Sequence, residues 1–398
     1  MSQQRIYISE SLTEGHPDKL CDQISDAVVD HLLMQDPCAR VRAECAVARA
    51  IVFIAARFAS SANIDFAWLA RKVIQRIGYD HPDFNPRTCS IITSPLALAS
   101  RAADQFDTET LTDAQIEAIP ARNQVTVFGF ACNQTPERMP LPITLAHRIA
   151  RQLSRARKEQ MIPGLMPDAR VQVGVAYKGL TPQSIYSITI EAHLDEKGAP
   201  DPPTLLEAIM KLVIMPAAGH GAVTIDARTR IAVNPEGPYS GGPMHHSGLT
   251  GRKTAVDAYG DYARQSSKAL SGKDPLRIDR IGAYAARYVA KNIVAAGLAE
   301  ECEVMLSYAT GLARPITLTV QTFGTGRLPD QRLSQMIEAH FDLRPAAILK
   351  EFKLRHLPAA HPTGFFQHLA AYGHFGRTDL DLPWEKTDKA HLLESTAS

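Results

Sequence analysis

The chain has 398 residues, of which 45% are hydrophobic and 21% are charged, and its formal net charge is +1. At roughly 100–200 residues per domain, this length predicts two or three domains with a sizeable core. The balanced charge excludes a general attraction to nucleic acid or to an anionic membrane. Six scattered cysteines without a CxxC pair argue against a disulfide scaffold or a zinc site and favour a reducing compartment. No apolar run approaches the ~20 residues of a membrane span, so we expect a cytoplasmic protein.

Helices and strands are predicted to alternate in three broad blocks. The predicted helices cover residues 17–34, 65–79, 143–160, 203–215 and 280–297. The predicted strands cover residues 42–58, 88–96, 125–134, 169–177, 184–194, 222–235, 301–311 and 315–324. The polar, acidic stretch 100–124 is expected to be a connection or a mobile loop. Residues 42–58 are expected to form one extended and mostly buried segment.

The first helix, in "EGHPDKLCDQISDAVVD" (14–30), concentrates charged and special-geometry residues. Pro17 suits the first helical position, which makes His16 the expected N-cap. A helix N-terminus attracts anions, and His16 and Lys19 would add donors there, while Asp18 suits magnesium. The stretch therefore fits a metal-bound triphosphate, but taken alone it fits a capped surface helix better. Three more acids recur every four residues on this helix and are expected to be structural: Asp22, Asp26 and Asp30.

Two further segments combine turns with positive charge. Residues 234–260 hold several glycines that let the backbone approach a ligand, followed by Arg252 and Lys253. This is not a Walker A loop, because Arg252 separates the last glycine from the lysine. His245 and His246 are adjacent there, but no third metal ligand follows at a suitable spacing. Residues 270–280, "LSGKDPLRIDR", hold three cations and two acids.

Each of these segments alone is also compatible with an ordinary charged turn. Together they supply cations from three distant parts of the chain. A site that grips a polyphosphate and neutralises its developing charge draws its donors in this way. The residues therefore predict a nucleotide enzyme without naming its reaction.

Seven stretches resemble the S-adenosylmethionine synthetases, or methionine adenosyltransferases, in the same order along nearly the whole chain. They are "SESLTEGHPDKLCDQISDAVVD", "FGFACNQTPERMPLPITLAHRIARQ", "GGPMHHSGLTGRKTAVDAYG", "SGKDPLRIDR", "AYAARYVAKNIVAAGLA", "AAYGHFGR" and "PWEKTDKA". The resemblance implies an α/β (α+β) fold of three intertwined, similar domains with pseudo-threefold symmetry. It places these domains at residues 1–103, 118–239 and 240–398. It also implies a homodimer or homotetramer with active sites between subunits.

The implied reaction is attack of a sulfur nucleophile, methionine in the family, on C5′ of ATP. The triphosphate leaves and is hydrolysed to phosphate and pyrophosphate. The resemblance implies that His16 contacts the leaving oxygen, that Asp18 and Asp279 hold Mg²⁺ (or Mn²⁺), and that Glu44 serves K⁺. The residues implied to bind the nucleotide or its phosphates are His16, Lys19, Arg252, Lys253, Ala269 and Lys273. Of these, His16, Lys19, Arg252 and Lys273 are expected to act in catalysis.

The acceptor side departs from the family pattern. Arg57 stands where the family has a glutamate facing the methionine ammonium, and His246 stands where it has an aspartate. Leu98 replaces a glutamine, Arg277 replaces a lysine, and Asn123 replaces an aspartate. Arg57 reverses a charge at a site built for a cation, which opposes binding of free methionine.

On the nucleotide side, an Asp-Gly-Lys is missing near residues 178–181, and Pro238-Tyr239 replaces an Arg-Phe pair at the adenine. Three readings remain open. The first, favoured by Arg57, is an adenosyltransferase with an altered sulfur-containing acceptor, for example an acidic one. The second is an ordinary methionine adenosyltransferase. The third is a catalytically weak paralogue that acts as a partner subunit of a true synthetase, and the retained phosphate residues argue against it.

Overall fold

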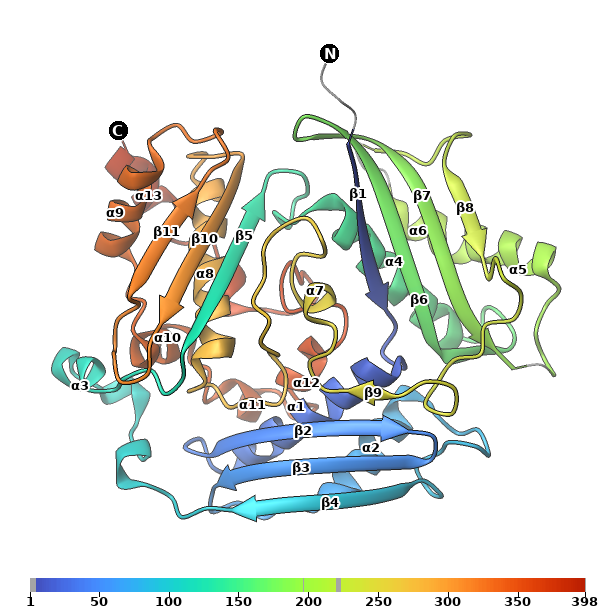
Figure 1. Ribbon diagram of the computed structural model, residues 1–398, viewed down its shortest axis with the longest axis horizontal. Coiled ribbons are helices and arrows are strands. Elements are labelled where there is room, and N and C mark those ends of the chain that lie inside the picture. Colours follow the sequence, from blue (N-terminus) through green and yellow to red (C-terminus); the bar gives the residue numbers. More distant parts are fainter. Residues whose placement is uncertain (1–4, 196, 220–222, 398) are drawn as a thin grey trace.

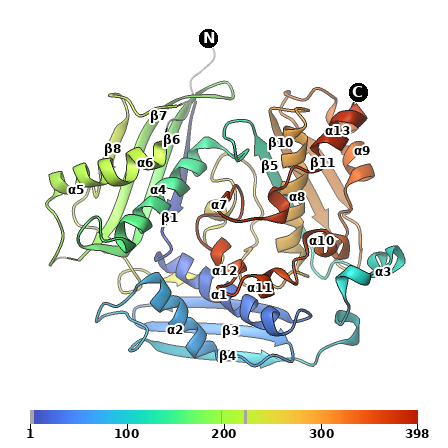
Figure 2. The ribbon, with the colours of Figure 1, turned by 180° about the vertical axis from the view of Figure 1, so that it is seen from behind.

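Three β-sheets with helices packed on one face of each make up the fold (Figure 1). The computed structural model describes residues 5–195, 197–219 and 223–397. Seen from behind, the helices cover all three sheets, while the front faces of the sheets carry no helix (Figure 2). Helix α1 (Pro17–Gln35) lies at the centre, where the three units meet. This mixed architecture confirms the predicted α/β class.

The first sheet has the strand order β1-β6-β7-β8. Its strands are β1 (Arg5–Leu12), β6 (Leu165–Lys178), β7 (Thr181–Leu194) and β8 (Arg230–Val233). Helix α4 (Leu141–Lys158) packs behind it, together with α5 (Pro202–Ile209), a π-helical turn (Met210–Ile214) and α6 (Met215–Ala218). The strand predicted over 222–235 is wrong in its first half, because pairing is confined to Arg230–Val233; residue 222 lies outside the described residues.

The π-helical turn has a cause in the sequence. Pro216 has no backbone N–H to donate to the Leu212 carbonyl four residues earlier, so the regular helical bond is missing. Gln152 of α4 donates a hydrogen bond of 2.9 Å to that carbonyl instead. The helix predicted over 203–215 is thus present but irregular at its end.

The second sheet has the order β4-β3-β2-β9, with α1 and α2 (Phe66–Ile77) behind it. Its strands are β2 (Arg40–Ala48), β3 (Ile51–Ala59), β4 (Ser90–Ala97) and β9 (Gly248–Leu249). The prediction of one extended segment over 42–58 is wrong, because this stretch is a hairpin. The turn falls at Arg49, which adopts a positive φ of 51° although no glycine, asparagine or proline marks it.

The third sheet has the order β11-β10-β5. Its strands are β5 (Val125–Cys132), β10 (Glu301–Tyr308) and β11 (Thr317–Gln321). The predicted helix at 280–297 is α8 (Ile278–Ala295), and it packs against β5 and β10. Beyond it lie helices for which no element was predicted: α9 (Asp330–His340), α10 (Pro345–Phe352), α11 (Leu357–Ala360), α12 (Phe366–Leu369) and α13 (Ala390–Ala397).

Each sheet takes one strand from a different part of the chain. β1 leaves the N-terminal block for the sheet of β6 and β7, β5 pairs with β10, and β9 pairs with β2. The blocks are therefore intertwined, as expected. Among the described residues, no helix has the length and hydrophobicity needed to cross a membrane.

The stretch 100–124 is held against the C-terminal part of the chain by ion pairs and hydrogen bonds. It contains two short 3-10 helices (Ala102–Asp104 and Thr108–Thr110) and α3 (Asp113–Glu117). Arg344 forms ion pairs with Asp113 and Glu117, and Arg355 donates to the Phe106 carbonyl. The predicted connection thus carries local structure and specific contacts.

Candidate functional site

His16 caps α1 with one ring nitrogen and leaves the other free. Its Nδ1 accepts the backbone N–H of Asp18 at 3.2 Å, and Pro17 follows in the first turn, which confirms the predicted cap. Burial lowers the pKa of His16 to about 3, so the ring is neutral near pH 7. With Nδ1 accepting, the single proton sits on Nε2, and this buried atom has no partner among the described residues. His16 is therefore an unused hydrogen-bond donor.

The four acids on one face of α1 hold three separate segments of the chain in place. Each acid accepts backbone N–H groups: Asp18 from Leu249, Asp22 from Gly251, Asp26 from Gly272, and Asp30 from Phe365, Phe366 and Gln367. The eight residues between Asp18 and Asp26 span about 12 Å of helix. The glycine-rich loop and the 270–280 segment are thereby set side by side along α1.

Two glycines make this docking possible. A Cβ on Gly248 would lie 2.1 Å from the Pro17 carbonyl oxygen. Gly251 has a φ of +76°, and a Cβ there would lie 2.2 Å from that of Ala269. Ala269, predicted to contact the nucleotide, therefore lies directly against the Arg252-bearing loop.

The ammonium group of Lys19 is not available to bind a ligand at the glycine-rich loop. Its side chain is fully buried, and its Nζ lies 2.7 Å from Asp22 and 2.6 Å from Asp257. Burial opposes the charge, but the two carboxylates outweigh it and raise the pKa of Lys19. The arrangement gives no support to the predicted role of Lys19 as a phosphate ligand. It makes Lys19 the centre of a closed ion triad.

Arg252 reaches the start of α1, and Lys253 reaches Glu10 in the second half of β1. Arg252 is 43% exposed, with its guanidinium 3.4 Å from Asp18 and donating to the Ser247 carbonyl. Lys253 lies 2.8 Å from Glu10. These two cations are accessible near His16, as a site for phosphate requires.

His246 is held by a residue that the sequence did not single out. Its Nε2 lies 2.7 Å from Oδ2 of the fully buried Asp168 and 3.2 Å from the hydroxyl of Tyr239. The rings of His246 and His16 are 5.0 Å apart. Asp168 sits inside β6, in "LMPDARVQV", where a lone acid in a buried strand was the only available signal.

Some charged side chains of the 270–280 segment are used in buried structural contacts, and others could bind a ligand. Arg280 is buried against Asp26, and Asp274 accepts from Arg40 and the Val41 N–H. Lys273 lies 3.7 Å from Asp279, whose carboxylate also accepts the Asn123 amide at 2.9 and 3.1 Å. Burial lowers the pKa of Lys273 to about 8, although Asp279 opposes this effect.

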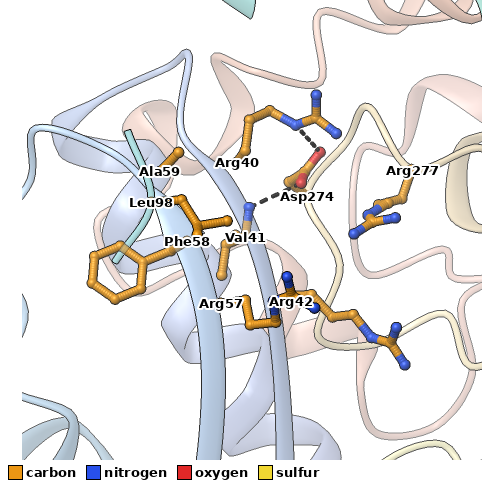
Figure 3. A pocket seen from close by; sticks show the side chains of 9 residues that line it. All are labelled: Arg40, Val41, Arg42, Arg57, Phe58, Ala59, Leu98, Asp274 and Arg277. Carbon is orange, nitrogen blue, oxygen red and sulfur yellow. Dashed lines mark hydrogen bonds and ion pairs between the residues drawn. The ribbon is translucent and has the colours of Figure 1, made fainter. Parts of the chain in front are cut away.

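Three of the predicted acceptor residues line one pocket of about 200 Å³ (Figure 3). They are Arg57, Leu98 and Arg277, and the pocket walls also include Arg40, Arg42 and Asp274. Arg57 lies directly opposite Arg42 in the β2–β3 ladder, where like charges repel. Neither Arg57 nor Arg277 has a side-chain ion pair among the described residues. The pocket is therefore strongly cationic.

Glu44 does not fit the predicted potassium site within one chain. Its side chain is 58% exposed and its carboxylate is bound at 2.5 Å by Arg42. A potassium ion requires several oxygen ligands, and the paired arginine would repel it.

Comparison with known proteins covers almost the whole chain. The family models described as S-adenosylmethionine synthetase N-terminal, central and C-terminal domains match residues 4–98, 118–239 and 240–386. The chain is 46% identical to the S-adenosylmethionine synthase of Gloeothece citriformis, over 100% of this chain and 98% of that protein. It is 48% identical to the enzyme of that name from Nostoc punctiforme (100% and 97%) and 44% identical to that from Trichodesmium erythraeum (100% and 98%).

Proposed function

This chain belongs to the S-adenosylmethionine synthetase family, and on that premise we propose that it makes S-adenosylmethionine from ATP and methionine. The full-length similarity to proteins named S-adenosylmethionine synthase favours methionine over the altered acceptor that Arg57 suggests. In the proposed reaction the methionine sulfur attacks C5′ of ATP, the C5′–O bond breaks, and triphosphate leaves before its hydrolysis to phosphate and pyrophosphate.

The observation that carries the proposal is the buried, unpartnered Nε2–H of His16 beside accessible cations. A neutral donor in a dry site stabilises charge that develops on the leaving oxygen without bringing a counter-charge of its own. Arg252 and Lys253 would bind the phosphates by charge-assisted hydrogen bonds. Lys273, held near Asp279, would extend the positive charge along α1.

Two carboxylates would hold Mg²⁺ with the phosphates. The fit rests on the donor set: within the part of the chain that the structure describes, the hydrogen bond from Leu249 goes to Asp18 Oδ1 and none goes to Oδ2, and the Asp279 carboxylate is contacted by the Asn123 amide and by Lys273. One or two carboxylates completed by phosphate oxygens and water is the usual protein environment of Mg²⁺. When bound, the ion neutralises phosphate oxygens. The K⁺ prediction at Glu44 has no such support.

The direct test is turnover of ATP and Mg²⁺ with and without methionine, with products measured by mass spectrometry. We expect methionine-dependent S-adenosylmethionine together with phosphate and pyrophosphate. Phosphate release without any S-adenosyl product would refute the proposal and indicate a triphosphate hydrolase.

A second candidate is an acceptor that keeps a carboxylate and a thioether sulfur but lacks the ammonium of methionine. The cationic pocket of Arg42, Arg57 and Arg277 favours it. If it holds, 4-(methylthio)butanoate, which lacks the ammonium, should be a better substrate than methionine. Arg57→Glu should then reverse the preference, with Arg49→Glu as a control because Arg49 lies in the β2–β3 turn outside the pocket. No change on Arg57→Glu would eliminate this candidate.

The family resemblance implies a homodimer or homotetramer, and we also propose that two copies meet through the open face of the second sheet. That face exposes several large apolar side chains: Ile51, Phe53, Ile92, Leu96 and Leu98. A patch of this kind is typical of an interface between subunits. Glu44 and Arg57 lie on the same face, so the acceptor pocket would be completed by the partner copy.

All six cysteines are free thiols, which supports a reducing, cytoplasmic location.

A further inference from the structure

A cavity of about 270 Å³ lies between α3, α8 and α10, and none of the residues that line it belongs to the candidate site. Helix α10 lies between the other two helices (Figure 2). The floor of the cavity consists of side chains that are at most 8% exposed: Ile116, Ala285, Tyr288, Phe341, Ile348 and Phe352. An apolar cavity of about 150 Å³ in a protein interior already binds benzene. This cavity is therefore large enough for an aromatic molecule of two fused rings.

The aromatic rings of the floor are arranged edge to face. The ring centre of Tyr288 lies 5.5 Å from that of Phe341 and 5.4 Å from that of Phe352. A further ring is attracted to such side chains in the same geometry. The Nζ atom of Lys389 lies 4.9 Å from the ring centre of Phe341 and 5.9 Å from that of Tyr288. The floor thus combines aromatic surface with a nearby ammonium group.

The charged residues that line the cavity are partly or fully exposed, so they form its rim. They are Asp342, Lys350, Glu351 and Lys389. Both carboxylate oxygens of Asp342 accept from Arg344, and Glu351 lies 3.8 Å from Lys389. Lys350 forms no ion pair within the described part of the chain, and its Nζ donates to the Leu111 carbonyl at 3.1 Å. The rim therefore has one cation without a carboxylate partner.

We propose that this cavity binds a small aromatic carboxylate. The rings of the ligand pack against Tyr288 and Phe341, and its carboxylate accepts charge-assisted hydrogen bonds from Lys350 and Lys389. A ligand with several phosphates would have to bury charge against the apolar floor, whereas an aromatic carboxylate keeps its single charge at the rim. An aromatic cation would place its charge beside the two lysines.

Helix α3 closes one side of the cavity through Ile116. It packs on α10 through a small hydrophobic cluster, separate from the main core, that includes Ala346 and Ala347. Its ion pairs with Arg344 use partly exposed carboxylates, and such pairs contribute little to stability. Local opening of α3 therefore requires little free energy and gives the ligand a way in. Asn123, six residues after α3, donates to Asp279, so the same loop continues to the candidate site.

The test uses two probes of similar size and opposite charge, indole-3-acetate and tryptamine, titrated into the full chain by calorimetry. We expect one indole-3-acetate per chain and binding of tryptamine that is at least about tenfold weaker. Lys350→Gln should weaken binding of indole-3-acetate about fivefold or more. Lys386→Gln, at an exposed lysine outside the cavity, should leave the affinity unchanged. Excess ATP or excess methionine, each added alone, should not displace the probe.

Hydrogen exchange gives a check that needs no variant. Indole-3-acetate should slow amide exchange in α3 and α10 and leave β3, which carries Arg57, unchanged. Equal affinity for the two probes, no binding of indole-3-acetate at millimolar concentration, or equal effects of the two lysine substitutions would overturn the proposal. Displacement by ATP or methionine, or slower exchange in β3 alone, would place the probe in the substrate site and overturn it as well. Binding is measured without turnover, so its failure leaves the proposed reaction unaffected.

Discussion

His16 uses its two ring nitrogens for different purposes. Nδ1 caps the N-terminus of α1 by accepting the backbone N–H of Asp18. The single ring proton therefore sits on Nε2, which is buried and has no partner among the described residues. The cap was predictable from Pro17 at the first helical position. The free donor was not, because it depends on the burial that β9 and the glycine-rich loop create around it.

Separating these two purposes gives a first prediction. His16→Asn keeps a side-chain acceptor at the N-cap, which asparagine supplies well, but removes the Nε2 donor. We expect kcat to fall by about 10²–10³ while the melting temperature stays close to that of the native protein. Steady-state kinetics and thermal unfolding measure both quantities. A kcat within about threefold of the native value would show that the donor has no part in the reaction.

Lys19 has partners that local sequence reasoning does not reveal. Its place in the first turn of a helix suggested an anion ligand, but Asp257, 238 residues later, closes a buried triad around it. Asp168 was missed for the same reason, since its partners His246 and the Gly242 N–H lie more than 70 residues away. Pairings of this kind depend on tertiary structure that no local pattern encodes.

The second prediction therefore treats Lys19 as structural. Lys19→Met leaves Asp22 and Asp257 buried without a cation, and such a loss costs about 3–5 kcal/mol. We expect a large fall in the urea midpoint of unfolding. Lys253→Met is the matched control, because its partner Glu10 is partly exposed and the pair contributes about 1 kcal/mol or less. Equal and small decreases in the urea midpoint for the two substitutions would contradict the structural role of Lys19.

At the scale of elements, α1 organises the site through its row of four acids. The i, i+4 spacing was visible in the sequence, but the loops that each acid binds were not. The β2–β3 hairpin was missed because its turn has no typical turn residue. The helix predicted over residues 65–79 is α2, and it ends at Gly78, which adopts the left-handed conformation that glycine tolerates. Local signals therefore located the long helices and most strands, and failed where tertiary packing selects the turn.

The C-terminal segment is tied to α8 by one carboxylate, which gives a pH-dependent prediction. Glu385 pairs with Arg287 and Lys291 and accepts the Gly376 N–H. Burial opposes ionisation, but the two cations outweigh it and lower the pKa of Glu385 below its ordinary 4.5. The folded carboxylate therefore stabilises the protein above pH 4.5, and this stabilisation is lost progressively as the pH falls below that value.

Glu385→Gln removes this contribution. The loss of stability caused by this substitution should be largest at pH 7 and should become smaller as the pH falls below 4.5. Thermal unfolding of the native protein and the variant, measured over this pH range, tests this expectation. Glu159→Gln, in an exposed pair with Arg155, should leave the native profile unchanged. A pH-independent effect of Glu385→Gln would show that the ion pairs are not its cause.

For the whole molecule, three one-sided sheets leave open faces that a single chain does not cover. Phe53 is 40% exposed at the centre of the second sheet, on the face that also carries Arg57. If two copies meet there, Phe53→Lys places a charge in an apolar interface and should convert the protein to monomers in sedimentation experiments. Trp68→Lys is the control, because Trp68 is 48% exposed but lies on α2 behind the sheet. Unchanged assembly in Phe53→Lys would place the interface elsewhere.

The proposed reaction joins methionine to the adenosyl group of ATP despite the positive charge of Arg57. One competition measures it directly: equimolar methionine and 4-(methylthio)butanoate are incubated with the protein, ATP and Mg²⁺, and the two S-adenosyl products are quantified by mass spectrometry. We expect S-adenosylmethionine to predominate. Predominance of the product without the ammonium, or ATP cleavage with neither product, would contradict it.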